Sequence, residues 1–337
     1  MMAKTLAAIS ASNTQSGDAA APAVPPIQNP LRIATETSVH KTLYMPSRLT
    51  TAEGGATAIK VVAVPKPNCT VPGLPATTLL MDETTGGARA VVNSAQLTGI
   101  RTAAASALAT RILASRESEN LVVFGAGVQA FHHARLIMEL IPYIASVQFV
   151  VRSRSNRATA IAEELNDIFP RVSITVITSE DATQAVRMAD IICTCVPSTE
   201  PLFAAEDVQF GAHINAIGSY TPSMFEFPPN LVSASSTSAS PRVPFVLVDS
   251  RSACLSEAGE LIAAKVTGDR LIELGELFDP TTGHLRDDEN ARQRLASLRE
   301  NGRSIFKCVG IGGMDVAITR LVVEAAEKRG LGTVLPF

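Results

Sequence analysis

A glycine-rich loop near the middle of the 337-residue chain constrains the fold more than any other feature. An apolar run at 121–124 leads into Gly-Ala-Gly-Val-Gln-Ala at 125–130, which has the spacing G-x-G-x-x-A, and a helical pattern follows. Glycine permits the tight turn and lets the backbone approach a pyrophosphate, which the N–H groups of the helix N-terminus then bind. The alternative is an ordinary tight turn between a strand and a helix. We predict a dinucleotide site formed by Gly125, Ala126, Gly127, Val128 and Gln129.

Strand and helix patterns alternate from residue 120 onward, which indicates βαβ units and a parallel sheet. Before them, short β-like runs at 58–64, 77–81 and 88–92 predict a small antiparallel or mixed sheet. A long helix is expected at 94–115. Another is expected at 312–329, and we expect it to return to the N-terminal part. Residues 1–30 are rich in Ala, Ser and Pro and predict a poorly ordered lead, and 233–244 predicts a surface insertion.

The end of the second predicted strand bears on cofactor choice. An NAD-binding protein usually places Asp or Glu there to bind the ribose 2′-hydroxyl. This chain has Arg152-Ser153-Arg154-Ser155 instead, with no acid before Glu163. Guanidinium groups suit a 2′-phosphate because they offer planar, charge-assisted donors. We predict NADPH, with NADH as a possible second cofactor; the alternative is a solvated loop with incidental arginines.

Two cations interrupt apolar patterns in the N-terminal part. Lys60 lies in the β-like run 58–64, and Arg101 shares a helix face with Leu97, Ala105 and Leu108. A cation directed into an interior needs a compensating anion. We predict that Lys60 and Arg101 bind a substrate carboxylate. A structural ion pair with a protein Asp or Glu is the alternative, as is a side chain that reaches solvent.

Composition excludes several function classes. The net charge of −3 and the absence of a basic run argue against a nucleic-acid partner. We find no apolar stretch long enough to span a membrane and no basic region of a signal peptide. Five scattered cysteines do not form a disulfide framework, so we expect a reducing, cytoplasmic location. No His and Cys ligand spacing predicts a metal.

Several motifs together resemble those of the ornithine cyclodeaminase/mu-crystallin family, over roughly residues 40–335. They are Thr57–Val64 with its lysine, the arginine-containing run Leu97–Leu108, the loop 125–130, GAHINAIG at 211–218, VDS at 248–250 with EAGE at 257–260, and LGEL at 274–277. The resemblance implies an α/β fold with a doubly wound Rossmann domain, 116–304, inserted into a discontinuous α+β domain. That second domain, 31–115 with 305–337, would bind substrate and form a homodimer.

The resemblance also implies roles for individual residues. Lys60 is similar to the family's substrate-carboxylate lysine, and Arg101 to the arginine between substrate and cofactor. Arg152, Ser153 and Arg154 match the segment that holds the NADPH phosphate. The remaining cofactor-binding residues implied in this way are Thr78, Val196, Pro197, Ile217, Gly218, Val309 and Gly310.

Two departures from the family pattern bear on the reaction. Family cyclodeaminases carry an acid/base Asp where this chain has Tyr220. With an unperturbed pKa of about 10, a tyrosine can donate a proton but is a poor base at neutral pH. The family's first carboxylate-binding arginine is also missing beside the segment 42–46, where His40, Lys41 or Arg48 could substitute.

The sequence therefore predicts an oxidoreductase that transfers hydride from NAD(P)H to the C=N bond of small imino acids. The predicted catalytic residues are Lys60, Arg101 and Tyr220. One alternative is an NAD-dependent cyclodeaminase or alanine dehydrogenase, and another is a non-catalytic NADPH-binding protein.

Overall fold

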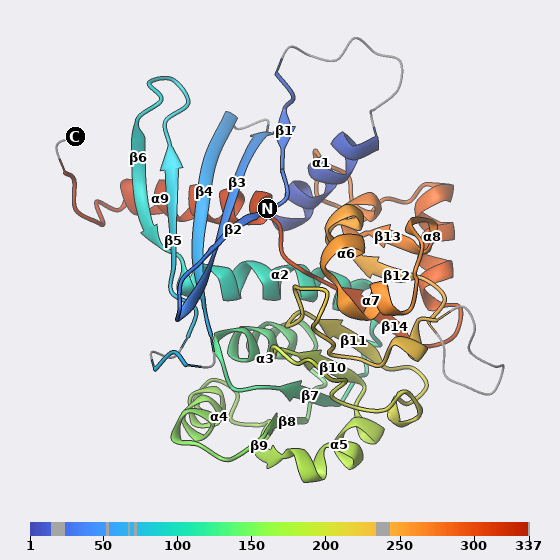
Figure 1. Cartoon of the computed structure of the whole chain (residues 1–337). Helices are drawn as coiled ribbons and strands as arrows, with labels where there is room; N and C mark the ends of the chain where they lie inside the picture. Colours follow the sequence, from blue (N-terminus) through green and yellow to red (C-terminus); the bar gives the residue numbers. More distant parts are fainter. Residues whose placement is uncertain (15–23, 52–53, 67, 71–72, 234–242, 336–337) are drawn as a thin grey trace.

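Two sheets organise the chain (Figure 1). The structure, a computed structural model, describes residues 1–14, 24–51, 54–66, 68–70, 73–233 and 243–335. One sheet is parallel and the other antiparallel, and helix α2 lies between them, in contact with α3 on one side and α9 on the other. The fold class predicted from the sequence is confirmed.

The parallel sheet has the strand order β13-β12-β14-β11-β10-β7-β8-β9. From β7 the chain runs outward through β8 and β9, and then returns to β10 and β11 on the other side of β7. A doubly wound sheet binds dinucleotides where the order reverses, which here is between β7 and β10. Its strands are β7 (Asn120–Phe124), β8 (Ser146–Val151), β9 (Ser173–Thr178), β10 (Ile191–Thr194), β11 (His213–Ala216), β12 (Val246–Val248), β13 (Leu271–Glu273) and β14 (Ser304–Lys307).

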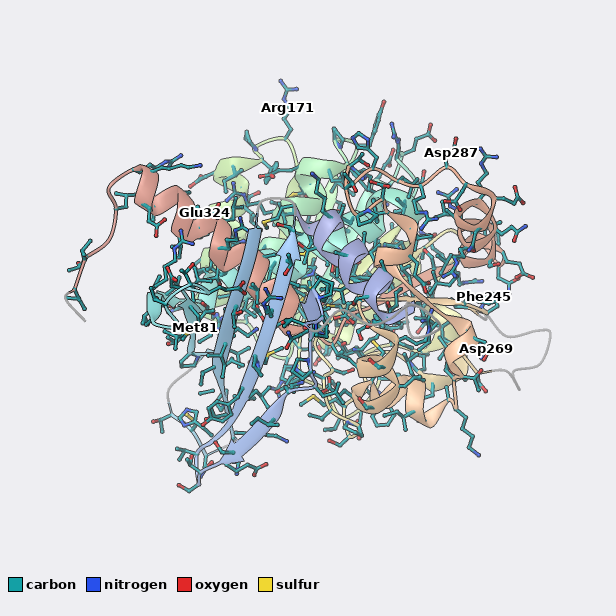
Figure 2. All side chains as sticks on the ribbon, turned by 90° about the horizontal axis from the view of Figure 1, so that it is seen from above. Met81, Arg171, Phe245, Asp269, Asp287 and Glu324 are labelled. Atoms are coloured by element: carbon teal, nitrogen blue, oxygen red, sulfur yellow. The ribbon has the colours of Figure 1, made fainter. Side chains whose placement is uncertain are left out.

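The antiparallel sheet has the order β1-β3-β4-β5-β6, and β2 pairs with β3. Residues alternate between its two faces. The inner face is buried under α9, which Figures 1 and 2 show running across the strands. Its strands are β1 (Ile27–Gln28), β2 (Ile33–Glu36), β3 (His40–Thr51), β4 (Gly54–Pro65), β5 (Ala76–Met81) and β6 (Ala88–Asn93).

Helices cover both sheets. The α-helices are α1 (Met2–Thr14), α2 (Ala95–Leu113), α3 (Val128–Leu140), α4 (Asn156–Ile168), α5 (Ala182–Met188), α6 (Arg251–Glu257), α7 (Gly259–Ala263), α8 (Glu289–Arg299) and α9 (Gly312–Lys328). Short 3-10 helices are η1 (Ser179–Asp181), η2 (Ala205–Asp207), η3 (Pro229–Leu231), η4 (Gly268–Arg270) and η5 (Leu274–Leu277). As predicted, the last helix returns to the N-terminal sheet.

Two expectations about chain organisation need correction. The lead 1–30 contains α1, whose Leu6 and Ile9 are buried against η5 and α9, because Ala-rich sequence is a good helix former once a neighbour covers it. The boundary at residue 305 divides β14, which pairs with β11 and β12 inside the parallel sheet. Most of the predicted insertion, 234–242, lies outside the described residues.

Candidate active site

The glycine loop connects β7 to α3 with the geometry that a dinucleotide needs. Gly125 has φ +108°, a left-handed conformation, and a Cβ there would lie 2.7 Å from Val196 Cγ1. Gly127 precedes the first turn of α3, whose free N–H groups point into the loop. Ala130 is fully buried between helix and sheet. The residues present therefore fit a bound pyrophosphate.

The ends of β10 and β11 continue this surface. A Cβ at Gly218 would lie 2.3 Å from the carbonyl oxygen of Val196, and the side chain of Val196 lies against Gly125. The backbone thus packs closely across three strand ends. The predicted residues Val196 and Pro197, after β10, and Ile217 and Gly218, after β11, lie next to one another at the switch point.

Arg152, Ser153 and Arg154 follow β8 and are exposed. Ser155 caps α4, since its side chain accepts a hydrogen bond from the N–H of Ala158. The sequence interpretation missed Arg157, whose guanidinium lies 3.3 Å from where a Cβ on Gly127 would stand. The signal was available, because Arg157 continues the same basic run into the first turn of α4.

Lys60 lies on the inner face of β4, directly opposite Met45 on β3 and Thr78 on β5. Only 2% of it is exposed. Its Nζ lies 2.8 Å from Asp315 in the first turn of α9. Burial lowers the pKa of Lys60 to about 8, although Asp315 opposes the shift.

Arg101 is buried on α2 and shares the same carboxylate, with its Nε 3.1 Å from Asp315. A Cβ on Gly310 would lie 2.7 Å from an Arg101 nitrogen, so only glycine fits between this guanidinium and the loop. Buried Asp249 holds that loop, because it accepts hydrogen bonds from the N–H groups of Val309 (3.3 Å) and Gly310 (2.7 Å). The structure thus brings Lys60, Arg101 and the predicted cofactor residues Val309 and Gly310 together.

A third cation, Arg32, lies beside this cluster. Its guanidinium pairs with Glu257, donates to the carbonyl oxygen of Val309 at 3.2 Å, and stands 5.9 Å from the ring centroid of Tyr220. Burial raises the pKa of the Tyr220 hydroxyl, while Arg32 lowers it by less. A small cleft opens here between the Arg32 segment, α6 and the loop 310–312.

A model of the ornithine cyclodeaminase/mu-crystallin family matches residues 12–330. The chain belongs to this family. It is 31% identical to the Delta(1)-pyrroline-2-carboxylate reductase of Bacillus cereus, over 93% of this chain and 90% of the relative. It is also 31% identical to the ketimine reductase mu-crystallin of Mus musculus, over 77% of this chain and 72% of the relative.

Solved structures share the whole fold. The Delta(1)-pyrroline-2-carboxylate reductase of Thermococcus litoralis, in complex with NADH and L-proline, superimposes with a TM-score of 0.78 at 25% identity, covering 99% of this chain and 94% of that chain. An archaeal alanine dehydrogenase dimer with bound NAD superimposes with a TM-score of 0.74 at 21% identity, covering 100% of this chain and 95% of that chain. At this identity the likeness supports the fold alone. The family resemblance inferred from the motifs is confirmed.

Three predicted substrate ligands lie away from this cluster. His40 contacts Cys69, Lys41 faces Glu36 at the start of β3, and Arg48 pairs with Glu83 at 2.9 Å. Strand alternation explains why Arg48 lies away from the cluster. Met45 pairs with Lys60 on the inner face of the sheet, and a residue three positions further along the strand lies on the opposite face. Arg32, by contrast, lies beside the cluster. Sequence reasoning missed Arg32 because it stands just after the N-terminal lead, where no periodic pattern marks it.

Two features are absent from the part of the chain that the structure describes. No helix there has both the length and the apolar character needed to cross a membrane. The same residues include no group of three or more His, Cys, Asp or Glu side chains that could hold a metal ion. The groups that the structure brings together at this site are three cations, a tyrosine hydroxyl and the dinucleotide loop.

Proposed function

We propose that this protein is an NADPH-dependent reductase of small imino acids that carry one carboxylate, including cyclic ketimine carboxylates. The observation that carries the proposal is the convergence of Lys60, Arg101 and Arg32 beside Gly310, at the carboxyl edge of the parallel sheet. Arg32 lines the cleft, and Lys60 and Arg101 lie buried beside it, so the local excess of positive charge suits a carboxylate. The names of the Bacillus cereus and Mus musculus relatives agree with reduction of a C=N bond.

The bound dihydronicotinamide would supply the hydride to the imine carbon. The residues of this chain then bind, orient and supply a proton. Lys60, Arg101 and Arg32 hold the carboxylate, which fixes the imine carbon against the cofactor edge of the site. The amine nitrogen gains one proton, so that C=N plus hydride plus proton gives CH–NH. Lys60, with its pKa of about 8, and the hydroxyl of Tyr220 both carry a proton near neutral pH.

Tyr220 supports reduction over deamination. Loss of ammonia from an amino acid requires a base that activates water, and a tyrosine whose pKa is raised by burial is protonated at neutral pH. Reduction of a preformed imine requires only a proton donor. This difference in chemistry favours an imine reductase over a cyclodeaminase.

We also propose that NADPH is preferred to NADH. Arg152, Arg154 and Arg157 surround the N-terminus of α4, and no carboxylate stands at the end of β8 to bind a 2′-hydroxyl. Guanidinium groups and helix N–H groups together favour a phosphate.

We further propose a homodimer formed through the outer face of the antiparallel sheet. Pro46, Ile59, Leu79 and Val91 stand opposite one another across four strands on this face, and Val91 is 66% exposed. A second copy would cover this apolar row. The segments 31–115 and 308–337 would then form the substrate and dimerisation domain. A cytoplasmic location is consistent with the five free cysteines.

Oxidation of NADPH with defined substrates tests the proposal. Pyrroline-2-carboxylate, piperideine-2-carboxylate, pyruvate with simple amines, and ornithine form the panel. We expect NADPH oxidation with at least one cyclic imine and none with ornithine. NAD-dependent turnover of ornithine without reduction of any imine would overturn the proposal.

A further inference from the structure

A charged cluster that the site described above does not use lies behind the turn at Gly218 and Ser219. It consists of Glu226, Glu260 and Lys307, and none of the three is exposed. Lys307 ends β14, Glu260 lies on α7, and Glu226 lies between β11 and η3. The ammonium is 3.0 Å from Glu226 and 3.6 Å from Glu260.

The hydrogen bonds assign the charges of this cluster. Glu226 accepts from the N–H of Gly218 at 2.7 Å, and Glu260 accepts from the N–H of Glu226 at 3.1 Å and from the hydroxyl of Ser219 at 2.7 Å. Lys307 donates to the carbonyl oxygen and the hydroxyl of Ser219 at 2.8 and 2.6 Å. Both carboxylates thus contact donors, as ionised groups do.

Burial and the neighbouring charges shift the pKa values of Lys307 and Glu226. Burial lowers the pKa of Lys307, but Glu260 and Glu226 raise it by more, so the ammonium is protonated. Burial raises the pKa of Glu226, and Lys307 opposes that rise. Because the contacts of Glu226 are with donors, we count it as a carboxylate. Two carboxylates and one ammonium leave one net negative charge among three fully buried side chains.

The cluster adjoins the cofactor surface. A Cβ on Gly218 would lie 2.6 Å from a carboxylate oxygen of Glu226 and 2.3 Å from Val196, which contacts the glycine loop at Gly125. In the strand order, β10 and β11 belong to the second half of the dinucleotide fold. The nicotinamide half of a dinucleotide lies over the strand ends of that half. The negative charge therefore stands behind the nicotinamide side of the site.

A nicotinamide ring is neutral when reduced and positively charged when oxidised. Buried ion clusters seldom stabilise a fold more than apolar residues of the same volume, so stability alone does not account for this one. We propose that Glu226, Glu260 and Lys307 together favour the oxidised nicotinamide, and so make hydride donation easier. This inference rests on the dinucleotide binding in the proposed function, and it is independent of the imine substrate.

The test compares the dissociation constants of NADP+ and NADPH, measured by calorimetry with no substrate present. Glu260→Gln keeps the shape of the side chain and removes its charge. The remaining charges, on Glu226 and Lys307, cancel, so the cluster becomes neutral. We expect the ratio of the NADP+ constant to the NADPH constant to rise on the order of tenfold, as for a unit charge about 10 Å away at an effective dielectric constant of about 20. Glu273→Gln is the matched control, because this carboxylate is also buried but ends β13 at the edge of the sheet. Its ratio should equal that of the wild type.

Two more variants test whether this ratio changes in the direction that the charge of the cluster predicts. Glu226→Gln should raise the ratio as Glu260→Gln does, and Lys307→Met, which adds to the net negative charge, should lower it. Glu260→Asp should restore the wild-type ratio. Equal weakening of both cofactor forms by Glu260→Gln would overturn the inference and leave a structural role. A wild-type protein that binds the cofactor but reduces no imine would contradict the proposed substrate alone, whereas one that binds neither form would contradict both.

Discussion

Lys60 of β4 and Asp315 of α9 form a buried ion pair, with the ammonium 2.8 Å from a carboxylate oxygen. The same carboxylate binds Arg101 at 3.1 Å. Both cations predicted to bind substrate therefore already have a protein partner, as the structural alternative in the sequence interpretation required. One carboxylate between two cations leaves an excess positive charge, which is what a substrate carboxylate needs.

Asp315→Asn should move the alkaline limb of the pH–rate profile to lower pH. Asp315 raises the pKa of Lys60 against the effect of burial, so its loss lowers that pKa further below about 8. Activity that needs the Lys60 ammonium is lost as pH rises through this pKa, and the loss then begins earlier. The variant should also lose about 3 kcal/mol of stability, since two buried cations lose their partner. An unchanged alkaline limb would mean that Lys60 is not the titrating group.

Lys60→Ala should separate an enzyme from a cofactor-binding protein. We expect NADPH to bind as in the wild type, because Lys60 lies on β4 and not on the glycine loop, while imine reduction falls about 100-fold or more. Fluorescence titration measures the binding, and NADPH oxidation measures the turnover. If wild type and variant both bind NADPH and neither reduces any imine, the non-catalytic alternative is favoured.

Arg32→Leu should raise the KM of the imine roughly 10- to 100-fold, since a charge-assisted hydrogen bond to a carboxylate is lost. Arg48→Leu is the control, because Arg48 pairs with Glu83 on the other side of β3 and should leave KM unchanged. Steady-state kinetics with a cyclic imine measures both. The reverse result would restore Arg48 as the substrate ligand.

Arg157→Ser should weaken NADPH about tenfold and leave NADH unaffected, because only NADPH carries the 2′-phosphate. Arg171→Ser offers a control of the same charge change at an exposed position just beyond the C-terminal end of α4, away from the first turn that holds Arg157 (Figure 2). Cofactor titrations measure both constants. Equal weakening of the two cofactors would indicate that Arg157 contacts the shared pyrophosphate instead.

Stability should fall as pH decreases from about 6.5 to about 4. Burial lowers the pKa of His133 and of His213 to about 4, below the usual value near 6.5 in an unfolded chain. The unfolded state therefore binds more protons in this window, and the stability present above pH 6.5 is lost as pH falls toward 4. Urea unfolding at pH 7 and pH 5 measures the loss. His133→Gln should reduce the difference between the two values, whereas exposed His284→Gln should not.

Local patterns were sufficient for part of this molecule. The glycine loop could be predicted because Gly125, Gly127 and Ala130 act within one strand, one turn and one helix. The inward position of Lys60 and Arg101 could be predicted because strand and helix periodicity direct side chains to one face. The motif series also identified the family.

Other features could not be predicted because their partners lie far apart in the chain. Helix α1 looked like a disordered lead, since its apolar residues become a buried face only where η5 and α9 meet it. Arg32 acquires its role from Glu257, Val309 and Tyr220, which no spacing around residue 32 indicates.

The sequence by itself determined the cofactor loop, the class of fold and the presence of inward cations, because each depends on neighbours within a few residues. Only the tertiary structure decided which anion those cations meet, which arginine joins them, and where the cluster of Glu226, Glu260 and Lys307 lies. Coulomb and hydrogen-bond energies depend on distances in space, and the packing of α9, α7 and β14 sets those distances.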